Sequence, residues 1–561
     1  MFKLITILLI LINISLLSYD FSEILPRDTI FYFTIKDFDS FTNKFNKTKI
    51  SKLYKAKDIE SIKKVFKKII SMSIYKEDED ISKIEILSKN FSKFIYHPFA
   101  FTIGLDNFFK PEYSLLIQGK NLDKDFEFIY KEVFKKELKT GKAIVKKEII
   151  KNIKVNILEV KYVDKYKKID PFKFNKNSKD NVRRFVYGVI DDKLIITSSK
   201  SYMKTLISSI KNKNIPKLKN NLIFKKDSIK YKDSELYMFT DLKTLIKLSS
   251  ADKEVKKTIN HYSLNKLESM ISYLKFENNS YDIFFKLTSL NTLPSIIKDV
   301  IFKNTTISVP EFIPDTCYSF NAISINFPEL YNTLTKYQTQ KERKKMLDME
   351  SRIGLNIKSI SSTIGKTIYI LSFFKNDKAN TLLLFTFNKP KILLNLIKNI
   401  GSSPIVGITE SDYLDGKVFT ASGSFNTIGL AIGYKNNNFI FGEIKLVKEM
   451  IQRMSGGNGS FYNSNFYKKL IKVMNKKQSV ISFTDLPISL NSNLKKINKE
   501  FKKDYKKASN KSEMKELKLT KRIINLLSEI NIKELRKYFN YLNVSIYTIK
   551  NELILEFKEV K

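Results

Sequence analysis

The sequence has one cysteine, two histidines and no tryptophan among its 561 residues. The lone cysteine, Cys317, excludes an intramolecular disulfide and a cysteine-rich metal site. As a nucleophile it would need a neighbouring histidine, and the chain offers only His97 and His261. The apolar segment around Cys317, IPDTCYSFNAI, predicts a buried strand instead. We expect His97 to be a strand residue next to Pro98, and His261 to be a surface residue beside a helix.

Motifs of well-known catalytic and nucleotide-binding sites are also missing. There is no phosphate-binding loop, dinucleotide-binding glycine motif, His-Glu-x-x-His or Gly-x-Ser-x-Gly. The glycine-rich segment Ser455–Ser460 follows an amphipathic pattern, which predicts a helix end in preference to an anion site. The acidic run Glu77–Asp80 lacks the glycine and distal glutamate of an EF-hand, so we expect a loop there. The sequence therefore predicts no catalytic residue, no metal ligand and no cofactor.

Negative charge is scarce, because 100 lysines and arginines face 58 aspartates and glutamates, a formal net charge of +42. A strongly basic chain invites a nucleic-acid function. Here the lysines are spread along the chain and accompany many asparagines, isoleucines, phenylalanines and tyrosines, a composition that AT-rich codons favour. We therefore disfavour nucleic acid as a partner. The charge still predicts solubility and attraction to anionic surfaces such as phospholipid head groups.

The one long apolar run begins near the first residue. Lys3 precedes an uncharged stretch from Leu4 to Leu17, the pattern of a secretory signal. A helix of this length reaches about 21 Å, short of the roughly 30 Å hydrocarbon core of a bilayer. Residues 1–18 are therefore predicted to be a signal peptide, with an uncleaved anchor in the inner membrane as the alternative. No cysteine lies nearby, which excludes lipoprotein processing, and we expect the rest of the chain in the periplasm or cell envelope.

Short motifs recur in the same order, which predicts an α+β fold made of two tandem, diverged copies of a mixed sheet-plus-helices unit. The first matching pair is Ser22–Phe45 and Glu311–Leu334, each a Pro-Asp-Thr turn, a strand and an amphipathic helix. Asp37 or Asp39 is placed to cap the first of these helices. The later matches are 52–94 with 341–360, 95–119 with 365–387, 124–134 with 390–400, 184–210 with 429–454, 235–248 with 479–490, and 271–287 with 539–557.

The boundary between the copies is predicted near Leu290–Thr306, which gives a first unit at 19–300 and a second at 301–561. A chain of this length exceeds the roughly 250–300 residues at which single cores stop growing. Two segments have no evident match and are predicted to be additions. Lys136–Arg183 reads as a basic hairpin with a polar loop, and Lys495–Arg522 as a charged helical excursion. We expect both to be solvated, with docking on an anionic partner as the alternative.

Two pairs of aspartates recur between the copies. Asp28 and Asp315 lie in the turn before a strand, and Asp241 and Asp485 end a strand in a shared Phe-Thr-Asp-Leu segment. Recurring carboxylates would suit a paired acid and base. Their places equally suit a turn and the cap of a following helix, and we predict these structural roles.

The segment Leu25-Pro26-Arg27-Asp28-Thr29, soon after the apolar run, resembles the mark of a bacterial family of exported proteins of unknown function. Ile313-Pro314-Asp315-Thr316 is a shortened second instance. The resemblance implies an exported protein and brings no catalytic residue or cofactor with it.

We therefore expect a non-catalytic binding or structural protein of the periplasm or envelope, with a groove or sheet face in each copy, acting on an unknown envelope protein or ligand. The alternative is a peripheral protein that binds the membrane surface or another polyanion through Lys136–Arg183 and Lys495–Arg522. A third hypothesis, an envelope hydrolase, has no recognisable site in the sequence.

Overall fold

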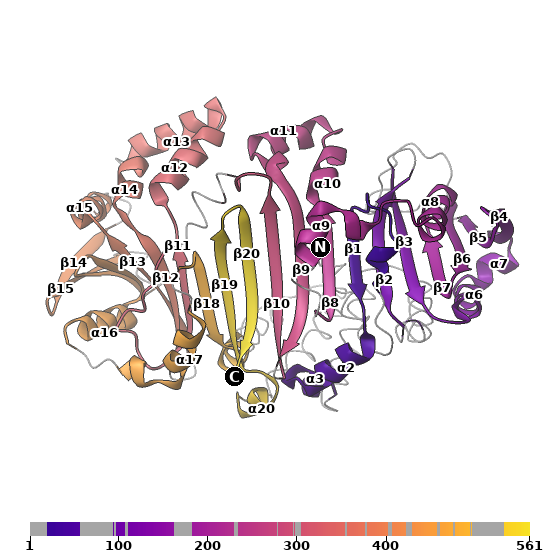
Figure 1. The fold of residues 1–561 in the computed structure, drawn as a ribbon. Helices are drawn as coiled ribbons and strands as arrows, with labels where there is room; N and C mark the ends of the chain where they lie inside the picture. The colour runs from indigo at the N-terminus through magenta and orange to yellow at the C-terminus, as the bar shows by residue number, and fades with distance from the viewer. Residues whose placement is uncertain are drawn as a thin grey trace. The chain divides into compact units, whose positions relative to one another are not determined.

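The protein is described from a computed structural model (Figure 1). The described residues are 20–55, 94, 97–106, 110–161, 182–228, 234–277, 279–294, 297, 305–353, 356–375, 378–401, 407–421, 429–456, 460–474, 477–493, 495 and 532–561. The predicted signal segment 1–18, the acidic run at 77–80 and most of the predicted excursion at 495–522 lie outside them. Within the described ranges, no helix combines the length and the apolar character needed to cross a membrane.

The fold is mixed α+β, as the sequence predicts, and its strands pair in antiparallel fashion. The chain divides into two compact units. The first comprises residues up to 248 together with 268–285, and the second comprises 249–267 and 286–561.

The first unit is built on a sheet whose strands run in the order β4, β5, β6, β7, β3, β2, β1, β8, β9 (Figure 1). Its N-terminal strand, β1, therefore lies inside the sheet, between β2 and β8. The strands are β1 (Phe31–Ile35), β2 (Phe99–Leu105), β3 (Pro111–Gln118), β4 (Ala143–Ile150), β5 (Ile153–Lys161), β6 (Val182–Ile190), β7 (Lys193–Thr197), β8 (Leu236–Asp241) and β9 (Leu267–Glu277), followed by β10 (Ser280–Ser289).

Helices cover both faces of this sheet. On one face, α2 and α6 pack against Phe33, Phe99 and Leu158. On the other, α8 contacts β6 and β7, while Phe224 of α9 packs its ring on Tyr32 and Phe239. The helices up to residue 261 are α2 (Phe38–Lys47), α3 (Lys49–Lys55), α6 (Leu122–Val133), α7 (Lys135–Lys139), α8 (Lys200–Lys211), α9 (Leu222–Ser228), α10 (Leu242–Ser249) and, in the second unit, α11 (Lys253–His261).

The second unit has strands in the order β14, β15, β16, β17, β13, β12, β11, β18, β19, β20. From β14 to β19 this order matches β4 to β9 strand by strand. Its strands are β11 (Cys317–Ser324), β12 (Ile364–Lys375), β13 (Lys378–Phe387), β14 (Ile408–Tyr413), β15 (Gly416–Ala421), β16 (Leu430–Lys435), β17 (Asn438–Glu443), β18 (Val480–Asp485), β19 (Tyr541–Ile549) and β20 (Glu552–Val560).

The helices of the second unit occupy corresponding places along the chain. After the first strand comes α12, after the third comes α15, and after the β16–β17 hairpin come α16 and α17. Leu446, Val447 and Met450 of α16 and Phe466 of α17 pack into one core with Phe320 of β11. Beyond α11, the helices are α12 (Phe327–Tyr337), α13 (Gln340–Ile353), α14 (Ile357–Thr363), α15 (Pro390–Gly401), α16 (Ile444–Met454), α17 (Asn465–Val473) and α20 (Ile532–Tyr538).

Local sequence chemistry explains the tight turns. Asp191-Asp192 joins β6 to β7 and Asn436-Asn437 joins β16 to β17, and all four residues have positive φ angles between 48° and 63°. Two-residue hairpins need this conformation, and aspartate and asparagine tolerate it better than most residues. Short polar side chains therefore form the turns of both hairpins.

The ends of two corresponding helices are fixed by buried lysines. Lys217 donates from Nζ to the carbonyl oxygen of Asn212, at the C-terminus of α8, over 2.9 Å. Lys435 of β16 is only 2% exposed, and its Nζ donates to Asp415 and to Ser455, the residue that follows α16. A lysine at a helix C-terminus complements the partial negative charge there.

Candidate functional site

An aromatic pocket lies within the first unit, between α6 and the strands of the sheet. Its volume is about 410 Å³. Most of the side chains that form its wall are aromatic or aliphatic. The lining residues are Phe101, Tyr113, Ser114, Leu115, Phe126, Ile129, Tyr130, Val133, Phe134, Leu158, Phe185, Ile196, Thr197 and Ser198.

The helical wall of the pocket follows from the spacing of apolar residues in α6. Phe126, Ile129, Tyr130 and Val133 are separated by three and four positions, so they lie on one face of the helix. The ring centroid of Phe126 lies 4.8 Å from that of Tyr187 on β6, in an edge-to-face arrangement. This contact holds the helix over the sheet at one side of the pocket.

Two polar residues of the lining, Ser114 and Thr197, direct their side chains to the other face of the sheet, because Leu115 and Ile196 beside them face α6. The Ser114 hydroxyl bonds to the Thr102 hydroxyl over 2.5 Å. The Thr197 hydroxyl donates to the carbonyl oxygen of Ser199 over 2.9 Å. A ligand in this pocket would find mainly ring and methyl surfaces, which is the chemistry of an apolar binding site.

One lining residue, Ser198, is bonded to a carboxylate. Ser198 Oγ donates to Glu112 Oε2 and accepts the backbone N–H of Tyr113 over 2.9 Å. Burial raises the pKa of Glu112, while its bonds to Ser198 and Ser199 lower that pKa. Through these bonds Ser198 ties the end of β7 to the start of β3.

The matching surface of the second unit differs. When the β16–β17 hairpin is placed on β6–β7 by its paired residues, Leu430 and Phe441 take the positions of Phe185 and Ile196. Leu430 is 39% exposed and Phe441 is 37% exposed. Nearer the centre of that sheet, Asn321 donates to Ser319 Oγ over 3.1 Å and accepts from Ser482 over 2.5 Å. The second unit therefore presents an open, partly polar face.

The recurring aspartates have the structural roles that the sequence predicts. Asp241 Oδ1 accepts the N–H of Thr244 over 2.9 Å, and Asp485 Oδ1 accepts that of Ile488 over 3.3 Å. Each side chain therefore caps the helix that follows its strand. Asp485 is also paired with Arg536, over 2.6 Å between Oδ2 and Nη2.

The Pro-Asp-Thr turns are also observed. Asp28 and Asp315 lie in turns before β1 and β11, in which the N–H groups of Thr29 and Cys317 donate to Pro26 and Pro314. Burial raises the pKa of Asp28. Asp37 Oδ1 accepts the N–H of Ser40, so Asp37, the first of the two candidates, caps α2. None of these carboxylates lines the aromatic pocket.

Cys317 is a buried strand residue of β11, as predicted, and burial raises the pKa of its thiol to about 12. His261 is the exposed last residue of α11. The prediction for His97 was wrong, because this residue lies in a bend before β2. Its N–H donates to Phe94, and pairing starts at Phe99 because Pro98 has no N–H to contribute.

The predicted helix end at the glycine-rich segment is confirmed. Helix α16 ends at Met454, and Gly456 has a φ of +120°, a conformation that favours glycine. Among the described residues, no group of three or more histidines, cysteines, aspartates or glutamates is placed to hold a metal ion.

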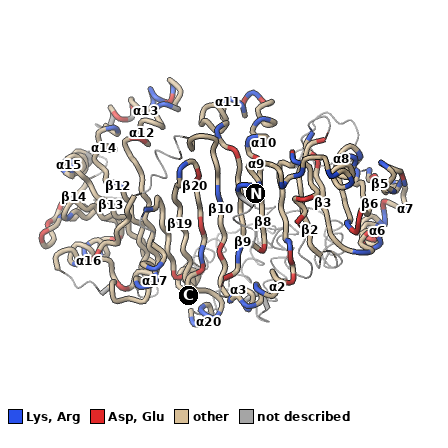
Figure 2. The backbone as a smooth tube through the Cα atoms, viewed as in Figure 1, with Lys and Arg blue, Asp and Glu red and all other residues tan. Residues whose placement is uncertain are grey.

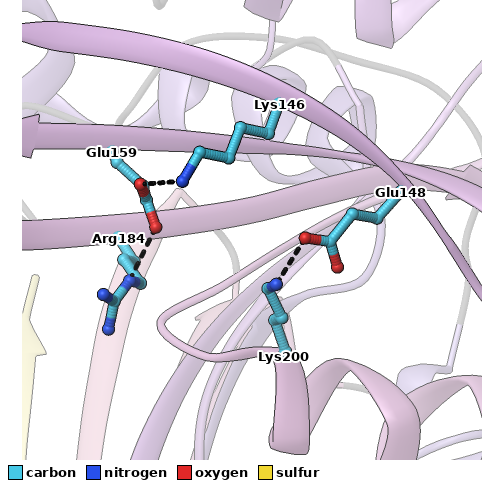
Figure 3. Close-up of polar contacts among 5 residues, drawn as sticks. All are labelled: Lys146, Glu148, Glu159, Arg184 and Lys200. Atoms are coloured by element: carbon cyan, nitrogen blue, oxygen red, sulfur yellow. Dashed lines mark hydrogen bonds and ion pairs between the residues drawn. The ribbon is translucent and has the colours of Figure 1, made fainter.

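The basic segment Lys136–Arg183 forms the predicted hairpin, β4–β5, with residues 162–181 outside the described ranges. Glu159 accepts from Lys146 over 2.8 Å and from Arg184 over 2.9 Å, and Glu148 accepts from Lys200 over 2.5 Å (Figure 3). The two Glu159 contacts lower the pKa of that carboxyl. Part of the basic charge is thus neutralised within the unit.

The hairpin itself was wrongly predicted to be an addition. In the second unit β14–β15 follows α15, as β4–β5 follows α6 in the first. The strands AIVKKEII and ITESDY share no charge pattern, so a search for similar sequence does not match them.

The pocket could not be predicted from the sequence. Its one sequence signal is the apolar stripe of α6. This stripe predicts that one face of the helix is buried against the rest of the protein, but it does not specify which strands lie there. No protein-family model, curated protein or solved structure matches the chain.

Proposed function

We propose that the chain is a non-catalytic, exported bacterial envelope protein that binds a small apolar ligand in the aromatic pocket of its first unit. The pocket of about 410 Å³, with rings on both the helical wall and the sheet, carries this proposal. Because the side chains of Ser114 and Thr197 point to the opposite face of the sheet, the wall offers little to a polar ligand. An acyl chain or a compact aromatic molecule is the chemical class that fits.

The export part of the proposal depends on residues 1–18 and on the Leu-Pro-x-Asp-Thr segment at Leu25–Thr29. Its test is the mass of the protein isolated from the envelope fraction of the organism that makes it. Loss of about the first 18 residues supports a cleaved signal. A full-length protein in the membrane fraction supports the anchor, and a full-length protein in the cytoplasm contradicts export.

We further propose that the two units are diverged tandem copies. The support is the matching strand order from β4 to β9 and from β14 to β19, together with the matching positions of the two-residue turns. The recurrent Phe-Thr-Asp-Leu segments, with Asp241 and Asp485 as helix caps, occupy equivalent strands β8 and β18. In this view one copy has an aromatic pocket and the other has an open face.

The pocket is tested with the fluorescent apolar probe N-phenyl-1-naphthylamine. The wild-type chain is expected to bind one probe molecule, with a rise in fluorescence. Ile196→Asp places a carboxylate among the rings and is expected to weaken binding at least tenfold, because a charge loses hydration there. Phe441→Asp, at the matching position of the second unit, is the control and should bind as the wild type does.

Equal loss in both variants, or no loss in the Ile196→Asp variant, would contradict the assignment of the pocket. Circular dichroism and thermal unfolding of each variant separate lost binding from lost folding. A hydrolase panel on the same preparations addresses catalysis, and turnover that disappears in a Ser198→Ala variant would contradict the non-catalytic part of the proposal.

A second candidate function is binding of an anionic membrane surface through the β4–β5 hairpin. Between residues 142 and 161 there are six lysines and two glutamates. Co-sedimentation with phosphatidylglycerol vesicles should then weaken steeply between low and physiological salt, since exposed charges are screened over about 10 Å at 0.1 M. Binding that ignores salt, or no binding, would contradict this function.

A further inference from the structure

Two hairpins of opposite charge lie at edges of the described sheets. Among the described residues, β4 pairs only with β5, and β14 pairs only with β15. An edge strand presents a row of backbone N–H and C=O groups to any strand that reaches it.

The turns determine which residues present these groups. Lys151-Asn152 joins β4 to β5, and Leu414-Asp415 joins β14 to β15. A two-residue hairpin closes on a hydrogen-bonded pair, and such pairs alternate along the ladder. The N–H of Lys161 donates to the carbonyl oxygen of Lys142 over 2.7 Å. Residues 142 and 161 therefore form a hydrogen-bonded pair, as this alternation requires in the β4–β5 ladder.

Residues between the hydrogen-bonded pairs direct their backbone N–H and C=O groups away from the partner strand, and we call them outward-facing. In β4 they are Val145, Lys147 and Ile149, and in β14 they are Ile408, Glu410 and Asp412.

The β4 edge carries apolar side chains that the first unit does not cover. Ile149 is 71% exposed, and Ile144 and Val145 are also exposed. Lysines commonly protect edge strands from association. Lys146 is engaged by Glu159, while Lys147 has no ion pair among the described residues.

The β14 edge is acidic in a chain that is otherwise strongly basic. From 407 to 421 there are three carboxylates and one lysine, against six lysines and two glutamates from 142 to 161 (Figure 2). Glu410 pairs with Lys417 and, over 3.6 Å, with Lys398, and Lys417 also lies 3.9 Å from Asp412. Glu410 and Asp412 are exposed on the surface of the hairpin.

We propose that molecules of this protein associate head to tail, with β4 of one molecule pairing antiparallel to β14 of the next. In one register the outward backbone N–H and C=O groups of the two strands can bond to each other. This register places Ile149 opposite Ile408 and Lys147 opposite Glu410, with both residues of each pair facing outward. On the other face it places Ile144 opposite Tyr413.

This register joins apolar residues at two positions and Lys147 to Glu410 at a third, and it sets Val145 opposite Asp412. Its interface uses two different surfaces, so each molecule keeps one free edge of each kind and association continues from molecule to molecule. Charge excludes the alternative pairings, because β4 against β4 brings lysines together and β14 against β14 brings carboxylates together. The partner that fits each edge is therefore a second copy of this chain.

The test is sedimentation velocity of the purified chain over a range of concentrations. The wild type is expected to form species larger than a monomer that dissociate as salt rises. Lys147→Glu and Glu410→Lys should each be monomeric, because like charges then meet at the interface. The double variant with both changes should associate again.

Mixing the two single variants gives the sharpest outcome. The intact β14 of Lys147→Glu can pair with the intact β4 of Glu410→Lys, and the two substituted edges are complementary as they are in the double variant, so the mixture should associate as the wild type does. A mixture that stays monomeric, or single variants that associate as the wild type does, would overturn the proposal. So would a wild type that is monomeric at every concentration.

A backbone variant separates strand pairing from simple charge attraction. Ile149→Pro removes an outward N–H without touching the pairing with β5, since proline is tolerated on edge strands. It should be monomeric with an unchanged melting temperature. A folded Ile149→Pro chain that associates like the wild type would exclude the strand-pairing model, and Lys147→Arg is the control that should associate normally.

Discussion

Tyr202 lies directly over Gly104. A Cβ atom built on Gly104 would be 2.6 Å from Cζ of Tyr202, and the tyrosine side chain is fully buried. The contact joins α8 to β2 and lets the helix approach the sheet closely. Glycine is needed here for space, because the residue has no positive φ angle.

Gly104→Ala is therefore expected to destabilise the protein by about 1–3 kcal/mol, the usual cost of overpacking a core. Urea unfolding followed by circular dichroism measures it. In a Tyr202→Leu background the same change should cost less, since the ring that it displaces is gone. Equal costs in both backgrounds would mean that the two residues do not compete for space.

Acid stability should depend on Asp415. Its hydrogen bond from Lys435 lowers the pKa of this carboxyl to about 2. A carboxyl with a lowered pKa stabilises the fold above its unfolded pKa, near 4, and that stabilisation is lost as the pH falls towards 2. Thermal unfolding between pH 5 and pH 2 should show a shallower decline for Asp415→Asn than for the wild type. Parallel curves would contradict the coupling.

The two helix caps should differ in energy. Asp241→Ala removes a cap and is expected to cost about 1 kcal/mol. Asp485→Ala also removes the partner of Arg536, so we expect about 2–3 kcal/mol from the lost charged hydrogen bond and cap together. Chemical unfolding measures both, and Asp485→Asn should lie between Asp485→Ala and the wild type. A larger loss for Asp241→Ala would contradict the role assigned to Arg536.

Cys317 should be unreactive in the folded protein. Its thiol is buried, and its pKa of about 12 leaves almost no thiolate at neutral pH. Ellman's reagent at pH 8 is expected to react with no thiol in buffer and with one per chain in 6 M guanidinium. Rapid reaction in buffer would mean that β11 opens locally.

The sequence predicted features that depend on neighbouring residues. The caps at Asp37, Asp241 and Asp485 and the turn at Asn436-Asn437 follow from side chains that bond or bend their own backbone. The burial of Cys317 follows from its apolar segment. These effects act within a few residues, so they can be read along the chain.

Features that depend on contacts between residues far apart in the sequence could not be predicted from it. The pocket needs the stripe of α6 to meet β2, β3, β5, β6 and β7, and nothing near Phe126 specifies which strands lie beneath it. The β14–β15 hairpin was missed because its acidic strand shows no likeness in sequence to the basic β4. His97 was misplaced because Pro98 has no N–H to give to the ladder, so the strand begins only at Phe99.

The central position of β1 has a kinetic consequence. Phe31 is paired with both Ile103 and Thr240, so the first strand to leave the ribosome waits for one partner that is synthesised much later. The second unit repeats the arrangement, with Phe320 paired to both Leu371 and Phe483. Loops this long must close before either sheet is complete, which makes folding slow and leaves the newly made chain open for an extended period. A protein with this topology is well suited to handling by factors that keep a polypeptide unfolded until its synthesis has ended.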